Sequence, residues 1–329
     1  MEFEDDPVYQ EQRSKLDNNF FDKTPQIAAQ FHKFRKQVEP IDVKKVWQKD
    51  MITHNADNSV QIIGNWASFD VLQYRNAPQK AGMSMIHLLA IPATEKIANG
   101  VALTIDNVGW IDMLIGTFKT AWTDPAIRQK ILQHQFDAVE RRAEKMEEEH
   151  DQFAKQAREV ALAHCGELKA MIEDLNIDDF HYGLHLRPDA SVDWLHLHIL
   201  AAPPKFRRYS TSAHDKKSKD AHEVRDFIIE DAIEEAIKSA RSLGPTELGT
   251  LSVSRRAALL SQMSGTPFEV EFQNIKESAD PKAINQRLRE ALCLEYPPSI
   301  RKKKTAKRAR SFRGFFSTFA EKGWQRTLQ

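Results

Sequence analysis

The stretch that decides the fold is residues 191–200, which read Ser-Val-Asp-Trp-Leu-His-Leu-His-Ile-Leu. Histidines alternate with apolar residues here, and a period of two is typical of a β-strand with one buried face. Because side chains alternate along a strand, His196 and His198 share one face and the apolar residues occupy the other. Two imidazoles on one face of a strand are suited to hold a metal ion or a phosphate group.

The histidine strand is the second arm of a predicted hairpin. Residues 178–186 read as a strand, and residues 187–190, Arg-Pro-Asp-Ala, are a turn that joins it to the histidine strand. His181 and His185 lie four residues apart, so they share one face of the first arm.

Earlier segments add further strands and a long helical region. Strands are predicted at 60–63, 69–74 and 85–92, the last ending in a proline. Apolar residues spaced three and four apart predict a helix over 108–122. The pair Asp124-Pro125 is typical of a helix start, and good helix formers continue from there to 175. We expect the charged part of that region to project into solvent.

This order of strands, helices and a hairpin predicts an α+β fold with an antiparallel sheet. The domain organisation that we expect is a helical N-terminal extension over 1–57, a main domain over 58–244 with a helical insertion at about 125–175, and a weakly structured C-terminal extension over 245–329. The extension includes a flexible basic tail at 301–314. We expect residues 205–222 to form a polar, basic loop and residues 223–243 an amphipathic helix.

Residues 60–205 resemble the histidine-triad (HIT) superfamily of nucleotide hydrolases and nucleotidyl transferases. In that family three histidines alternate with apolar residues, often after a Ser-Val pair. Ser191 and Val192 match the pair, and His196 and His198 match the second and third histidines. Residues 87–92, His-Leu-Leu-Ala-Ile-Pro, are similar to another strand of the family. Trp194 departs from the pattern, because it stands where the first histidine should be.

The resemblance implies a HIT-like antiparallel sheet and a nucleotide as substrate, an adenine nucleotide in the first instance. His196 would attack the α-phosphorus of a nucleoside phosphoanhydride or phosphoramidate, and would form a nucleotidyl-histidine that water or an acceptor discharges. His198 would bind a phosphoryl oxygen. Ser191, His87 and His185 are candidates for further nucleotide or phosphate contacts. The family uses no cofactor and is often dimeric, so no cofactor and a homodimer are expected.

Two other classes of function stay open. Trp194 and the helical insertion favour a non-catalytic nucleotide-binding or regulatory protein. A zinc hydrolase would use His196 and His198 with a third ligand, for which His181 and His185 are the nearest candidates. Since no other group of histidines or acids shows a recognisable ligand spacing, we expect no metal site.

Charge and cysteine content bear on location and partners. Eight of the 47 basic residues, and no acidic residue, lie within 301–314, which leaves the rest of the chain at a formal charge of −8. Such a basic segment is suited to bind nucleic acid or a nuclear import receptor. Cys165 and Cys293 are too few for a disulfide framework or a zinc finger, which favours a reducing compartment. We expect a cytoplasmic or nuclear protein without a membrane span.

Overall fold

The computed structural model describes residues 6–16, 21, 23–37, 50–65, 82–190, 192–242, 251–278 and 280–292. The chain divides into two compact units, Met1–Ile229 and Glu230–Gln329. The predicted strand at 69–74, Ser191 and the basic tail at 301–314 lie outside the described residues.

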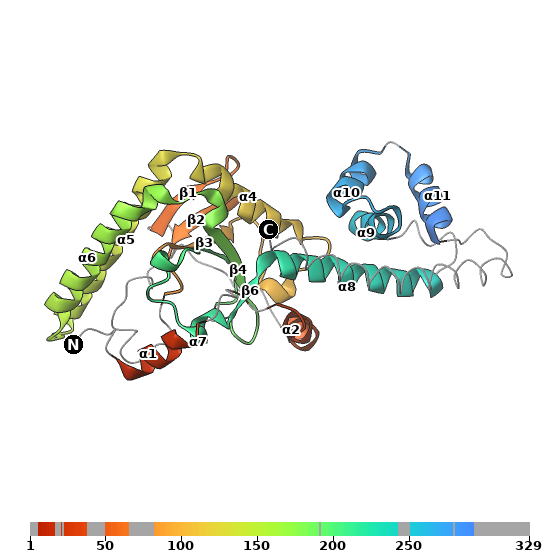
Figure 1. The fold of residues 1–329 in the computed structure, drawn as a ribbon. Helices are drawn as coiled ribbons and strands as arrows, with labels where there is room; N and C mark the ends of the chain where they lie inside the picture. The colour runs from red at the N-terminus through yellow and green to blue at the C-terminus, as the bar shows by residue number, and fades with distance from the viewer. Residues whose placement is uncertain are drawn as a thin grey trace, which may run out of the picture. The chain divides into compact units, whose positions relative to one another are not determined.

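The first unit is built on a six-stranded antiparallel sheet with the order β1-β2-β3-β5-β4-β6 (Figure 1). This confirms the predicted α+β class. The strands are β1 Met51–His54, β2 Val60–Gly64, β3 His87–Pro92, β4 Phe180–His185, β5 Leu197–Ala201 and β6 Ser218–Asp220. The predicted hairpin is the β4–β5 pair, and its second strand lies at the middle of the sheet against β3.

The sheet begins and ends in segments that the sequence did not mark as strands. Strand β1 pairs with β2, so the sheet starts inside residues 1–57 and not at residue 58. At the other edge, β6 pairs with β4 inside the segment that was predicted to be a loop. That segment also holds helix α7 (Ser212–Asp215), and its Phe206, Tyr209 and Ser210 are buried.

Helices cover one face of the sheet. Helix α4 (Gly109–Trp122) packs its apolar side against the sheet, where the Phe118 ring lies 4.8 Å from the Phe180 ring and Trp122 lies 4.6 Å from it. Helix α5 (Pro125–Glu148) begins at the predicted position, because the Asp124 side chain accepts from the Ala126 N–H. We call this face of the sheet the helix face.

The long insertion is a helical hairpin and not one continuous helix. Helix α5 ends at Glu148, and α6 (Ala154–Met171) returns beside it (Figure 1). His150 in the connection has a φ of 56°, in the left-handed region that turns the chain. Residues 147–150 at the tip are exposed, which matches the expectation that the charged part reaches solvent.

N-terminal segments complete the first unit. Helices α1 (Pro7–Ser14) and α2 (Gln26–Phe34) lie within the N-terminal extension that was predicted to be helical. The Tyr9 hydroxyl and the Arg13 guanidinium of α1 donate to backbone carbonyls of Arg207, Arg208 and Ser210, which ties α1 to the segment that precedes α7.

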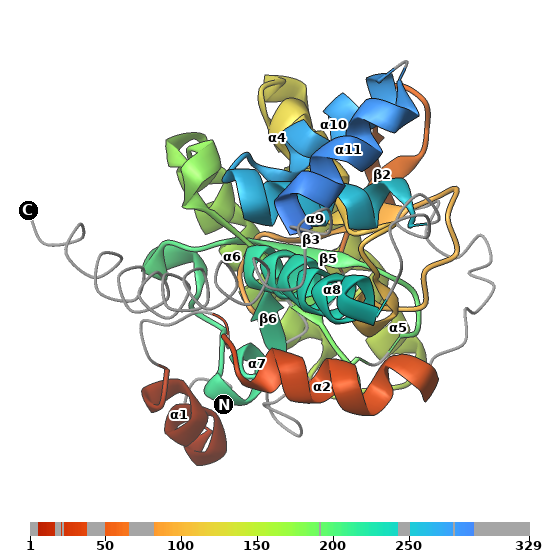
Figure 2. The same ribbon diagram turned by 90° about the vertical axis from the view of Figure 1, so that its right-hand side faces the viewer.

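Helix α8 (Ala221–Ser242) starts in the first unit and crosses the boundary at Ile229. The second unit contains α9 (Val253–Ser264), α10 (Phe268–Glu277) and α11 (Pro281–Leu292), which lie together in both views (Figures 1 and 2). They share a small apolar core, which includes Leu260, Ile275 and Leu288. These three helices lie within the C-terminal extension expected over 245–329. In the described part of the chain, every helix is too short or too polar to cross a membrane.

Candidate functional site

Four predicted site residues gather on the face of the sheet opposite the helix face. Strand pairing sets His198 of β5 between Leu89 of β3 and Gly183 of β4, and these three residues share one face. His87, His185 and His196 each lie two residues along the chain from one of these three, so they are on the same face. We call His87, His185, His196 and His198 the histidine cluster; their side chains are all at least nine-tenths buried.

His196 is held in one tautomer by the backbone. Its Nδ1 lies 2.6 Å from the carbonyl oxygen of Trp194, and a carbonyl only accepts, so Nδ1 carries the proton. The lone pair is therefore on Nε2, the atom that a nucleophile or a ligand must offer.

Trp194 stands where the HIT pattern has its first histidine, and its side chain is buried and hydrogen-bonded. Its indole Nε1 donates to the carbonyl oxygen of Pro92 at 3.1 Å, and the side chain is 6% exposed. Trp194 thus links β3 to the segment that leads into β5. Its backbone carbonyl, and not its side chain, serves His196.

His198 is oriented by a relay that starts at Asn65. Asn65 lies just after β2, and its backbone N–H donates to the carbonyl oxygen of His87. Its side-chain Nδ2 contacts both nitrogens of the His87 ring, and the shorter contact, 3.2 Å, is to Nδ1. An amide nitrogen only donates, so His87 Nδ1 accepts and His87 Nε2 is protonated. His87 Nε2 then donates to His198 Nδ1 at 2.7 Å, which leaves the proton of His198 on Nε2.

His198 Nε2–H is thus a donor beside the lone pair of His196. The two rings lie 4.9 Å apart, and His198 Nε2 is buried without a hydrogen-bond partner among the described residues. The ring of His185 stacks on His198 at 3.9 Å between centroids, and its Nε2 is likewise buried and unpartnered. Both nitrogens therefore have an unused hydrogen-bonding position on this face of the sheet, where a ligand could contact them.

Burial keeps the cluster neutral. It lowers the pKa of His87, His185 and His198 well below the usual histidine value, and repulsion from neighbouring histidines, His214 and His185 among them, lowers these pKa values further. For His196 burial also lowers the pKa, against the opposing effect of the Trp194 carbonyl. A neutral His196 keeps its nucleophilic lone pair at neutral pH.

One residue near the cluster gave no signal in the sequence. His214 of α7 comes within 5.9 Å of His185 and 6.4 Å of His87, ring to ring, because the segment before it folds back over β3. There the Met85 N–H donates to Phe206 O, and the hydroxyl of Ser210 donates to Met83 O. A histidine in a basic, hydroxyl-rich segment is not distinctive without this contact.

His181, one of the two candidates for a third metal ligand, lies away from the histidine cluster. It stands opposite Leu200, and its ring lies 5.8 Å from Phe21.

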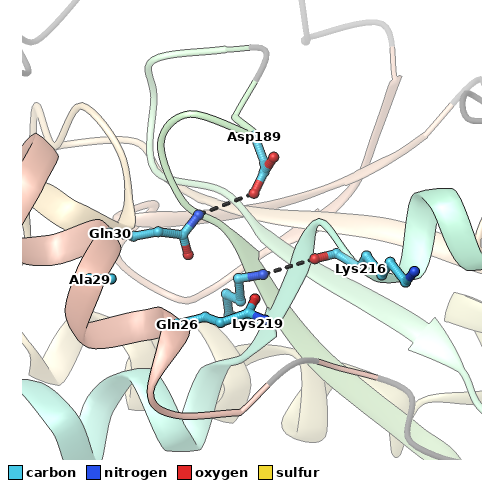
Figure 3. A pocket seen from close by; sticks show the side chains of 6 residues that line it. All are labelled: Gln26, Ala29, Gln30, Asp189, Lys216 and Lys219. Carbon is cyan, nitrogen blue, oxygen red and sulfur yellow. Dashed lines mark hydrogen bonds between the residues drawn. The ribbon is translucent and has the colours of Figure 1, made fainter.

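A separate pocket of about 490 Å³ lies between α2 and the chain around Asp189 (Figure 3). Its lining includes Lys219, whose Nζ donates to the carbonyl of Lys216, and Gln30, whose Nε2 donates to Asp189. Lys219 stands opposite Leu184, on the helix-face side of the sheet. The pocket therefore does not contribute to the site at His196.

Within the described residues, His185, His196 and His198 form the one group of three histidine, cysteine or acidic side chains whose ligand atoms all lie within 4.8 Å of one another. The third ligand that a metal site would require is thus His185 and not His181. Comparisons of the chain with family models, with curated proteins and with solved structures find no match.

Proposed function

We propose that the chain is a HIT-type nucleotide hydrolase or nucleotidyl transferase with His196 as its nucleophile. The observation that carries the proposal is the hydrogen bond from His196 Nδ1 to the Trp194 carbonyl, because it leaves the Nε2 lone pair available for attack. The resemblance of residues 60–205 to HIT proteins adds the substrate class, an adenine nucleotide that carries a phosphoanhydride or phosphoramidate bond.

The reaction has two steps. The His196 Nε2 lone pair attacks the α-phosphorus, a P–N bond forms, and the bond to the leaving group breaks. Water or an acceptor alcohol then attacks the same phosphorus and loses a proton to solvent, which balances the proton that the leaving group takes up from solvent. The P–N bond breaks, and the nucleotide leaves while His196 returns to its neutral form. His198 Nε2–H donates to a non-bridging oxygen as charge builds on it.

Trp194 is compatible with this chemistry. It leaves the carbonyl that His196 needs in place and fills the position of the first triad histidine with a buried indole. The alternative is a protein that binds a nucleotide without turning it over. Trp194 favours that alternative only if the lost histidine is needed for the rate.

A substrate panel tests the proposal. The purified full chain is incubated with adenosine 5′-phosphoramidates, dinucleoside polyphosphates and capped RNA fragments, and products are separated by chromatography. His196→Ala should lower turnover by more than about 1,000-fold, as expected for a covalent nucleophile. The control is His54→Ala, which removes an exposed histidine from the edge strand β1. Binding of a nucleotide without turnover by the parent chain would favour the regulatory alternative.

A further inference from the structure

The histidine cluster also contains three potential metal ligands, of which the nucleotidyl mechanism uses only His196 and His198. The ligand atoms of His185, His196 and His198 lie within 4.8 Å of one another. For His196 and His198 the atom that remains is Nε2, because Nδ1 of each is hydrogen-bonded. For His185, Nε2 is the buried atom without a partner among the described residues.

Three converging imidazole nitrogens suit zinc. At a Zn–N distance of about 2.1 Å, the nitrogens of a tetrahedral site lie about 3.4 Å apart. Since the ligand atoms lie within 4.8 Å of one another, they must approach by about 1.4 Å at most when zinc binds. Hard cations such as Mg²⁺ and Ca²⁺ require oxygen ligands, and the trio offers none.

We propose that His185, His196 and His198 form a reversible zinc site and that zinc occupying it inhibits the enzyme. The inhibition rests on the proposed function, while the binding does not. A zinc ion on His196 Nε2 uses the lone pair that would attack phosphorus, so the metal-bound and reactive states exclude each other. Three neutral ligands leave the fourth position of the ion to water.

Zinc binding requires the relay to reverse its direction. In the metal-free state His198 Nε2 carries a proton, and a ligating nitrogen cannot. The proton of His198 must be on Nδ1, where it donates to His87 Nε2, and the proton of His87 moves to Nδ1. The Asn65 amide then turns its oxygen toward His87. One proton leaves Nε2 of His198 and one arrives at Nδ1 of His87, so the total number of protons on the two rings does not change.

The test measures zinc affinity of the full chain by competition with a chromophoric chelator, without nucleotide. We expect one zinc per chain and an X-ray absorption spectrum with three imidazole nitrogens at about 2.0–2.1 Å. His185→Ala and His198→Ala should each weaken zinc binding by more than about 100-fold. Loss of a residue that only hydrogen-bonds to a metal ligand weakens binding by less than this. His181→Ala, on the same strand and face as His185, should bind as the parent does. Circular dichroism checks that each variant is folded.

Three outcomes separate the claims. An absence of zinc binding by the parent, or parental affinity in folded His185→Ala, would overturn the site. Zinc binding by a chain that never forms a nucleotidyl-histidine when metal-free would leave the site standing and refute the proposed function together with the inhibition. Faster turnover with zinc than after treatment with a chelator would overturn the inhibition and favour the zinc hydrolase.

Discussion

Replacing Asn65 by aspartate should change the activity and the zinc affinity of the cluster in opposite directions. Asn65 Nδ2 donates to His87 Nδ1, and this sets the direction of every proton in the relay to His198. A carboxylate only accepts, so Asn65→Asp would hold a proton on His87 Nδ1 and leave His87 Nε2 as an acceptor. His198 would then donate from Nδ1, and its Nε2 would carry a lone pair.

The magnitude follows from the contact that this reversal removes. In the parent, His198 Nε2–H donates to a charged phosphoryl oxygen, and a hydrogen bond to a charged group contributes about 1.5–3 kcal/mol. Its loss from the transition state corresponds to about 10–150-fold in kcat/KM. Zinc affinity should rise by about 10-fold, because a carboxylate behind a ligating histidine pair raises the basicity of the ligand.

The assay determines kcat/KM and zinc affinity on the same preparations. Asn65→Ala removes the donor without imposing the reverse direction, so both quantities should change less. Gln61→Glu controls for the added charge, since Gln61 stands on β2 opposite Ile91, four residues along β3 from His87. A parental kcat/KM in Asn65→Asp would refute the relay, and a fall in both activity and zinc affinity would indicate general damage to the site.

Three further predictions concern stability and the tail. Gly64→Ala should destabilise the fold by about 1–3 kcal/mol in urea denaturation, because the added Cβ would overlap the His134 ring. Gly116→Ala should be neutral or stabilising, because no heavy atom lies within 4 Å of the Cβ added there. The free energy of unfolding should fall as the pH is lowered from 6.5 to 5, because burial lowers the pKa of the cluster histidines and the unfolded chain therefore binds more protons in that window. Each such histidine should contribute up to about 1.4 kcal/mol per pH unit. A free energy of unfolding that does not change with pH would contradict neutral histidines in the folded chain. Removal of residues 300–329 should leave turnover unchanged and shift the cellular distribution of the protein seen by microscopy, because the eight basic residues of 301–314 are suited to an acidic partner; an unchanged distribution would remove the targeting role.

The centre of the sheet was predictable from local patterns, and its edges were not. Residues 197–201 alternate, so the strand and the common face of His196 and His198 followed from the sequence. Strands β1 and β6 are four and three residues long and become strands only through pairing with β2 and β4. The break between α5 and α6 also gave no signal, because residues 149–153 contain no glycine or proline.

The site was predictable to the extent that it follows from strand registry. His87, His185, His196 and His198 come together because β3 and β4 flank β5 on either side. The relay from Asn65 and the approach of His214 depend on loop geometry after β2 and before β6, which no periodicity encodes. His181 shares the face of His185 but lies four residues along β4, so the same alternation could not choose between them.

The most direct test of the central claim is to find the covalent intermediate and its position. The metal-free chain is mixed with an adenosine phosphoramidate labelled at the α-phosphorus, quenched in alkali, digested, and analysed by mass spectrometry. We expect a base-stable, acid-labile adenylyl group on the peptide that contains His196, absent from His196→Ala and present in His54→Ala. Turnover without any adduct on His196, or an adduct on another residue, would contradict the role of His196 as the nucleophile.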